Sequence, residues 1–241
     1  HRGAGDLAPE GSLEAFELGW KLGCIPEADL RQTKDGVIVS FHDASFARIL
    51  PDAPEELKRK GVEDLTFEEA RQLDVGGFRD SKFKGQRMIS LAEMVQRLKA
   101  HPHRALYIDI KRVDFRRLAA ETIEGHRQLI LARTKHDELK LWRQLAPRSR
   151  TLHWMGGPRN WTSPSTDPTA DPQARLAQRL EALRAVRFAG IDQLQIHVNT
   201  SPEGVFFPSE AFLRETGREL REHGILFQTL PWGQNDLRVF H

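Results

Sequence analysis

The sequence predicts an α/β protein, and within that class a (β/α)8 barrel of the TIM type. Seven apolar runs that are typical of strands alternate with segments of helical periodicity. The length of 241 residues is close to the roughly 250 that such a barrel takes. Polar side chains of catalytic types follow several of the runs, as expected where a barrel places its active site. A doubly wound sheet is the competing architecture.

The first elements are predicted to be a helix and two strands. Ser12 is a typical N-cap residue, and residues 12–22 carry apolar side chains at helical spacing. Strands are predicted over residues 24–30 and 37–42, joined by a charged turn. A preceding strand that ends at His1 would make these the second and third strands of the barrel.

Residues 44–87 interrupt the alternation. Prolines, a charged run and a short helix with capping-box spacing at Thr66 and Glu69 replace the expected pattern. We interpret this segment as a small insertion after the third strand of one domain that spans residues 1–241.

The alternation resumes at Ser90, which has capping-box spacing with Glu93. We interpret residues 156–171, rich in Gly, Pro, Ser and Thr, as a loop that could act as a lid. One apolar stripe, Leu176, Leu180, Leu183 and Val186, is predicted to pack on the barrel. Helices are predicted over residues 90–100, 114–126, 136–146, 171–190 and 209–223, and strands over residues 105–111, 129–132, 151–155, 191–198 and 225–232.

Composition narrows the function classes. No apolar run of about 18 residues is present, so no transmembrane segment is predicted. The net charge of +2 comes from evenly spread charges without a basic stripe, which argues against nucleic-acid binding. Cys24 is the one cysteine, so intramolecular disulfides are excluded, and we expect it in the core. Because the chain starts at His1 rather than Met, we expect further residues before it. The compartment, whether cytoplasmic, periplasmic or secreted, and the oligomeric state stay open.

Acidic, basic and imidazole side chains are expected to meet at the barrel mouth. Glu27 and Asp29 are two residues apart on one strand and therefore share a face. The strand candidates end near these six residues: His1, Glu27, Asp29, His42, Asp109 and Lys111.

Three carboxylates suit a hard divalent cation, Mg²⁺ or Ca²⁺, because these ions take oxygen ligands. Arg2 and Lys111 beside such an ion would suit a phosphate group, and two histidines would suit proton transfer near neutral pH. The alternatives are a solvated edge strand for Glu27 and Asp29, and an ion pair within one strand for Asp109 and Lys111.

Six short motifs stand out in the chain: His1-Arg2-Gly3, Pro9-Glu10, Glu27-x-Asp29, Thr33-Lys34-Asp35-Gly36, His42-Asp43 and Asp109-x-Lys111. Together they resemble the glycerophosphodiester phosphodiesterase family. In Ile89–Glu93 and in Trp232 with Asn235, the chain also resembles later family motifs. It departs from the family where Gly11 replaces the usual Asn and Asp109 replaces the usual Glu. It also stops at His241, where the family continues with a closing helix, so we expect further residues there.

The resemblance implies a TIM barrel that hydrolyses small-molecule glycerophosphodiesters to an alcohol and glycerol phosphate with the help of a divalent metal ion. By position, it implies that His1 and His42 are the acid–base pair, that Arg2 and Lys111 hold the phosphate, and that Glu10 orients Arg2 or a histidine. The implied metal ligands are Glu27, Asp29 and Asp109.

Four residues in the second half are candidate substrate contacts, with packing in the barrel wall or loops as the alternative: His153, Trp161, His197 and Trp232. Two other functions stay open. One is a phospholipase of the sphingomyelinase D type, which forms a cyclic phosphate. The other is a catalytically inactive barrel that binds phosphodiesters.

Overall fold

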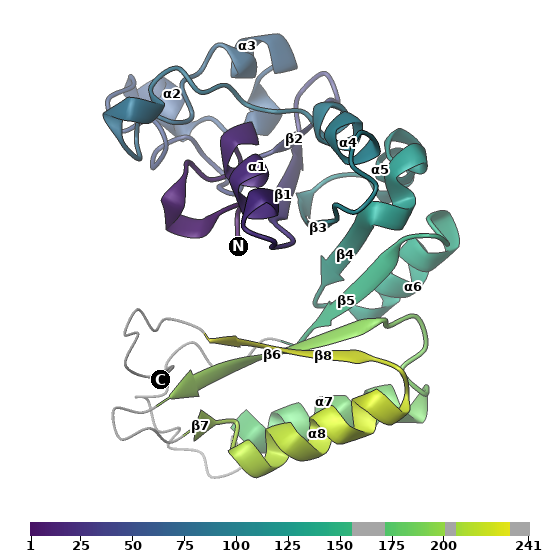
Figure 1. The fold of residues 1–241 in the computed structure, drawn as a ribbon. Coiled ribbons are helices and arrows are strands. Elements are labelled where there is room, and N and C mark those ends of the chain that lie inside the picture. Colours follow the sequence, from purple (N-terminus) through teal and green to yellow (C-terminus); the bar gives the residue numbers. More distant parts are fainter. Residues whose placement is uncertain (156–171, 201–205, 232–241) are drawn as a thin grey trace. The chain divides into compact units, whose positions relative to one another are not determined.

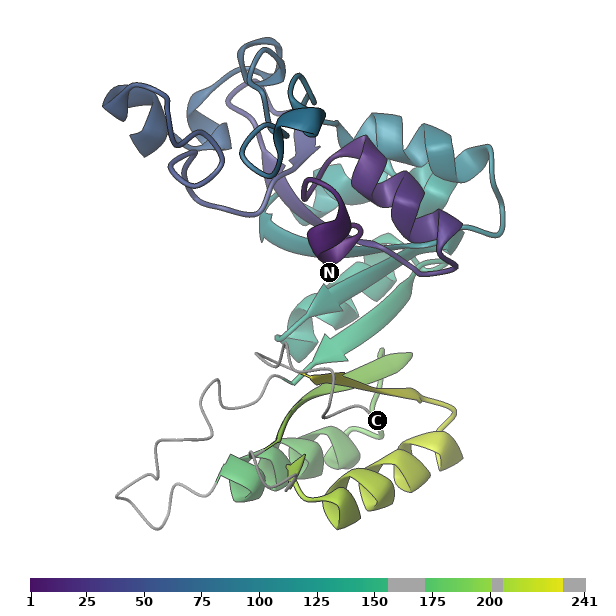
Figure 2. The same ribbon diagram turned by 60° about the vertical axis from the view of Figure 1, so that its left-hand side comes forward.

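The computed structural model of this protein describes residues 1–155, 172–200 and 206–231 (Figures 1 and 2). The chain divides into two compact units, and each is described by itself. Unit 1 comprises residues 1–132 and 142–150, and unit 2 comprises residues 133–141 and 151–241. Helix α6 (His136–Leu145) has residues in both.

Unit 1 is built on a sheet with the strand order β2-β1-β3-β4. Strand β3 pairs parallel with β1 and with β4, and β1 pairs antiparallel with β2. Short 3-10 helices lie at Gly5–Leu7, Val62–Asp64, Ser81–Phe83 and Ile123–Gln128. The other elements are α1 (Leu13–Lys21), β1 (Glu27–Gln32), β2 (Ile38–Ser40), α2 (Glu55–Arg59), α3 (Phe67–Arg71), α4 (Leu91–Lys99), β3 (Leu106–Arg112), α5 (Phe115–Glu121) and β4 (Leu129–Arg133).

The predicted helix starts in unit 1 are confirmed. The Ser12 hydroxyl accepts a hydrogen bond from the Ala15 N–H at 3.2 Å and begins α1. Both predicted capping boxes are present, one at the start of α3 and one at Ser90, where the Glu93 carboxylate accepts the Ser90 N–H at 2.9 Å. Such caps satisfy N–H groups that a helix leaves without an internal partner.

The run at 37–42 is a strand, but its predicted role as a parallel barrel strand is wrong. Only residues 33–37 join β1 to β2, and a parallel crossover needs a dozen or more. Thr33 closes the turn, since its hydroxyl accepts the Val37 N–H at 2.9 Å. The two strands therefore form an antiparallel hairpin.

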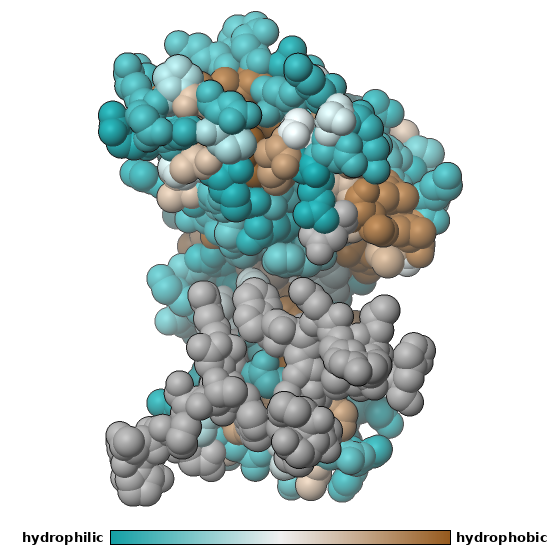
Figure 3. Space-filling view, turned by 90° about the vertical axis from the view of Figure 1, so that its left-hand side faces the viewer, coloured by the Kyte–Doolittle hydropathy of each residue, from teal (hydrophilic) through white to brown (hydrophobic). Residues whose placement is uncertain are grey.

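Residues 44–87 pack through an apolar cluster that includes Phe46, Ile49 and Val62 from the segment and Val39 from β2. The predicted insertion is thus anchored to the hairpin by its own small core. On the face of unit 1 drawn in Figure 3, the surface is mostly hydrophilic. Cys24 is exposed, so its predicted place in the core is wrong.

Unit 2 has strand β6 paired parallel with β5 and β8 and antiparallel with β7. Helices α7 and α8 lie side by side beside β6 and β8 (Figures 1 and 2). In the apolar stripe of α7, three leucines are buried as predicted, whereas Val186 follows the helix end and is 44% exposed. The elements are β5 (Arg150–Trp154), α7 (Pro172–Ala185), β6 (Gln193–Thr200), β7 (Phe206–Phe207), α8 (Glu210–Glu222) and β8 (Leu226–Pro231).

Two sequence predictions concern residues outside the described ranges. These are the candidate lid at 156–171 and the candidate contacts Trp161 and Trp232. Within the described residues, no helix combines the length and the hydropathy needed to cross a membrane.

Candidate active site

Three carboxylates of unit 1 meet at the junction of β1 and β3. One oxygen each from Glu27, Asp29 and Asp109 lies within 4.8 Å of the other two. The parallel register sets Asp29 opposite Asp109, and Glu27 shares the face of Asp29 because it is two residues away. The shorter side chain of Asp109, where the family usually has Glu, still reaches the cluster.

The acids do not end their strands as predicted. Strand β1 begins at Glu27, and Asp109 lies in the middle of β3. Pairing with β2 extends β1 beyond its acids to Gln32, and β3 continues past Asp109 alongside this extended part of β1. Burial raises the pKa of the Glu27 carboxyl, and the nearby Asp29 charge raises it further.

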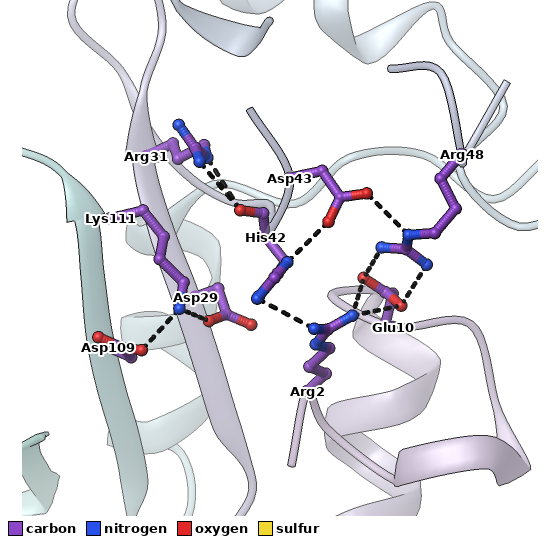
Figure 4. A network of polar contacts seen from close by, with 9 residues as sticks. All are labelled: Arg2, Glu10, Asp29, Arg31, His42, Asp43, Arg48, Asp109 and Lys111. Atoms are coloured by element: carbon purple, nitrogen blue, oxygen red, sulfur yellow. Dashed lines mark hydrogen bonds and ion pairs between the residues drawn. The ribbon is translucent and has the colours of Figure 1, made fainter. Parts of the chain in front are cut away.

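Lys111 neutralises part of this negative charge. Its ammonium lies 2.9 Å from Asp29 Oδ1 and 2.7 Å from Asp109 Oδ2 (Figure 4). Burial by itself lowers the pKa of Lys111, but the two carboxylates outweigh it and raise the pKa overall. The Lys111 ammonium therefore places a positive charge among the acids.

Arg2 links the acids to His42. Its backbone N–H donates to Glu27 Oε2 at 3.0 Å, and its guanidinium donates to both Glu10 oxygens at 3.2 Å. Gly3 explains the close packing of this segment on α1: its φ is +98°, and a Cβ there would lie 2.6 Å from the Ala15 Cβ.

The neighbours of His42 determine the tautomer of its neutral ring. Nδ1 lies 2.7 Å from Asp43 Oδ1, and Nε2 lies 3.0 Å from an Arg2 guanidinium nitrogen. A carboxylate only accepts and a guanidinium only donates, so we assign the proton to Nδ1 and the lone pair to Nε2. Nε2 is thus the nitrogen that can take a proton.

His1 is exposed at the start of the chain, and its carbonyl accepts the Gly5 N–H at 3.1 Å. It directly precedes Arg2, whose N–H is bound to Glu27, so the backbone keeps His1 next to the acidic cluster. Gly11, where the family usually has Asn, also lies at the site. Its φ is +67°, and a Cβ would be 3.1 Å from the Ser40 hydroxyl.

Sequence reasoning missed two arginines. Arg31 donates to the His42 carbonyl from two nitrogens at 3.1 Å and forms an ion pair with Glu63 at 2.7 Å. Arg48 donates to Asp43 Oδ2 at 2.7 Å and to Glu10 at 2.8 and 2.6 Å (Figure 4). Arg31 could have been predicted at the site, because it lies two residues after Asp29 on the same strand. No local pattern in the sequence indicated Arg48.

His153 and His197 belong to unit 2 and are 4% and 7% exposed. Burial, helped by the charge of Arg179, lowers the pKa of His153 to about 4. The Trp154 indole N–H donates to His197 Nε2. Both histidines are thus buried in unit 2, and their role as substrate contacts stays a prediction.

Comparison with solved structures shows the fold class of the chain. The chain superposes on a glycerophosphodiester phosphodiesterase from Agrobacterium tumefaciens with a TM-score of 0.59 and 22% identity, covering 96% of this chain and 94% of that chain. It superposes on an Oleispira antarctica phosphodiesterase in complex with the product sn-glycerol-3-phosphate with a TM-score of 0.65 and 19% identity, covering 99% and 85%. These likenesses show an α/β fold of the TIM-barrel class, as predicted.

Residues 1–241 match the glycerophosphoryl diester phosphodiesterase family, and the chain belongs to that family. A glycerophosphodiester phosphodiesterase from Caldanaerobacter subterraneus is 35% identical over 98 residues, which are 40% of this chain and 37% of the relative. The Bacillus subtilis protein YhdW is 34% identical over 112 residues, 46% of this chain and 43% of the relative. The chain therefore spans less than half the length of these two relatives.

Proposed function

We propose that this chain hydrolyses glycerophosphodiesters to an alcohol and glycerol phosphate. The observation that carries the proposal is the meeting of three carboxylates, two cationic side chains and a histidine of assigned tautomer within unit 1. The names of the relatives, and the bound sn-glycerol-3-phosphate of the Oleispira antarctica structure, agree with this reaction.

The acidic cluster fits a divalent cation, because three carboxylate oxygens within 4.8 Å form the oxygen-rich donor set that Mg²⁺ and Ca²⁺ prefer. Glu27, Asp29 and Asp109 would hold the ion. When bound, it would neutralise charge on the phosphoryl oxygens of the substrate.

Side chains of this chain bind the phosphate and transfer the protons. Arg2 and Lys111 bind the phosphate through charge-assisted hydrogen bonds. His42 takes a proton at Nε2 from the attacking hydroxyl, and Asp43 stabilises the imidazolium that results. His1 returns a proton to the leaving alkoxide. Glu10 keeps the Arg2 guanidinium in place, as its two contacts at 3.2 Å indicate.

The test is a panel of glycerophosphodiesters with choline, ethanolamine, glycerol and inositol head groups, assayed with Mg²⁺ or Ca²⁺ and with EDTA. We expect EDTA to abolish turnover and His42→Ala to lower it by about 10²–10⁴-fold, the usual contribution of general acid–base catalysis. His103→Ala is the matched control, because His103 is an exposed histidine before β3.

Product analysis by ³¹P NMR completes the test. A linear glycerol phosphate supports the proposal, and a lasting cyclic phosphate would instead indicate the sphingomyelinase D type of reaction. Metal binding without turnover of any member of the panel would contradict the proposal and favour an inactive, phosphodiester-binding protein.

A further inference from the structure

Arg48 joins two arms of the candidate site that are far apart in sequence. Its Nε donates to Asp43 Oδ2 at 2.7 Å, and its two terminal nitrogens donate to the two Glu10 oxygens at 2.8 and 2.6 Å. Asp43 uses its other oxygen for His42, and Glu10 also accepts from Arg2 (Figure 4). One guanidinium thus holds both carboxylates that orient the proposed catalytic groups.

The segment that carries Arg48 is itself well anchored. Phe46 and Ile49, on either side of it, are 0% and 3% exposed within the apolar cluster of residues 44–87. The Phe46 N–H donates to the Lys60 carbonyl at 3.0 Å, and the guanidinium lies 5.8 Å from the Phe78 ring centroid. The side chain therefore reaches the site from a fixed base.

The alternative is an ordinary surface ion pair, because the Arg48 side chain is 43% exposed and exposed ion pairs contribute little to stability. Geometry argues for more. The guanidinium forms a fork with Glu10, which is the directional arrangement that distinguishes arginine from lysine. Its partners are also the groups that touch Arg2 and His42, rather than unrelated surface acids.

We propose that Arg48 is a positioning residue for the phosphodiesterase reaction, which holds Asp43 so that the His42 ring keeps its proton on Nδ1 and its lone pair on Nε2. This inference rests on the proposed function for its catalytic consequence, whereas the effect on the ring does not depend on it. Without Arg48, Asp43 loses a 2.7 Å donor and is free to leave Nδ1. Glu10 loses the same guanidinium, so the Arg2 side chain that donates to Nε2 is also held less firmly. The interrupting segment 44–87 thereby becomes part of the catalytic apparatus.

The experiment compares Arg48→Met, Arg48→Lys and the wild-type protein. We expect Arg48→Met to lower kcat by about 10- to 100-fold, as loss of an outer-shell partner does, with a smaller change in KM. Lysine can contact one acid but cannot form the fork, so Arg48→Lys should give an intermediate kcat. In ¹⁵N NMR of the imidazole ring, Arg48→Met should populate the Nε2–H tautomer of His42, and the wild type should not.

The matched control is Arg71→Met. Arg71 is 44% exposed, pairs with Glu93 at 3.0 Å and lies 5.5 Å from the Phe67 ring centroid, so it repeats the surroundings of Arg48 away from the residues of the candidate site. It should leave kcat and the His42 ring unchanged. Thermal melting establishes that each variant is folded. If Arg48→Met does not fold, the same measurements on Arg48→Lys test the proposal.

Two results would overturn the inference: a kcat within about twofold of wild type with the Nδ1–H tautomer retained, or an equal loss in Arg71→Met. If the wild-type protein turns over no glycerophosphodiester, the proposed function fails. The ¹⁵N NMR measurement of the His42 ring still tests whether Arg48 positions that ring. A His42 tautomer that does not respond to Arg48→Met then refutes the positioning role independently.

Discussion

Replacing Lys111 by methionine should strengthen metal binding while it removes activity. The ammonium lies 2.9 Å from Asp29 and 2.7 Å from Asp109, within the group of acids that is proposed to hold the cation. Methionine keeps an unbranched apolar side chain and removes the charge. The metal-free variant then contains buried carboxylates without their counter-charge, and a divalent cation relieves their repulsion.

The magnitude follows from the burial of the ion pair. Removing one partner of a fully buried pair costs about 3–5 kcal/mol. The Lys111 side chain is 24% exposed, whereas its partners are 5% and 8% exposed, so we scale the cost down to about 2 kcal/mol for partial solvation. A cation that recovers this free energy binds roughly 30-fold more tightly, at about 1.4 kcal/mol per factor of ten.

Isothermal titration of metal-free protein with Mg²⁺ and Ca²⁺ measures this change directly. Lys140→Met is the control, because Lys140 pairs with Asp137 at 2.7 Å on the exposed side of α6. Turnover of the Lys111→Met variant should fall, since Lys111 is proposed to hold the phosphate. Unchanged or weaker metal affinity would show that Lys111 does not compete with the cation, and would refute the reasoning.

Three further predictions concern other parts of the chain. The pKa of His153 is about 4 in the folded state against a reference value of 6.5, so the neutral ring contributes about 3 kcal/mol to the free energy of unfolding above pH 6.5, and this contribution is lost as the pH falls to 4. In urea unfolding, His153→Gln should therefore show a flatter dependence of the unfolding free energy on pH, and an unchanged dependence would contradict this. Gly3→Ala should cost about 1–3 kcal/mol and lower kcat, because the new Cβ meets α1, whereas Gly5→Ala, with nothing within 4 Å, should cost less in thermal melting. Ser90→Ala should lose about 1 kcal/mol of stability with the N-cap but leave kcat unchanged, which separates folding from chemistry.

The sequence was sufficient to predict those features that depend on strand periodicity and helix capping. The period of two places Glu27 and Asp29 on one face, and hydroxyl caps mark the starts of α1 and α4. The antiparallel hairpin could also have been predicted, since the connection at 33–37 is too short for a parallel crossover.

The rest of the site depends on long-range packing. That Asp109 lies opposite Asp29 follows from the register of β1 with β3, which no local motif specifies. Arg48 is one of many charged residues between 44 and 87, and only the folded apolar cluster directs it toward Glu10 and Asp43. A lone charged residue in such a segment resembles any solvated side chain.

The hairpin of β1 and β2 also has a consequence for the order of folding. It carries two of the clustered acids, and His42 lies two residues after its end. Its contacts have short sequence separation and therefore form quickly. Asp109 joins only when β3 pairs with β1 across more than seventy residues of chain, a slower step because loop closure precedes it. The proposed cation should therefore bind tightly only after β3 has paired with β1. Metal affinity followed during refolding would then measure when these two strands pair.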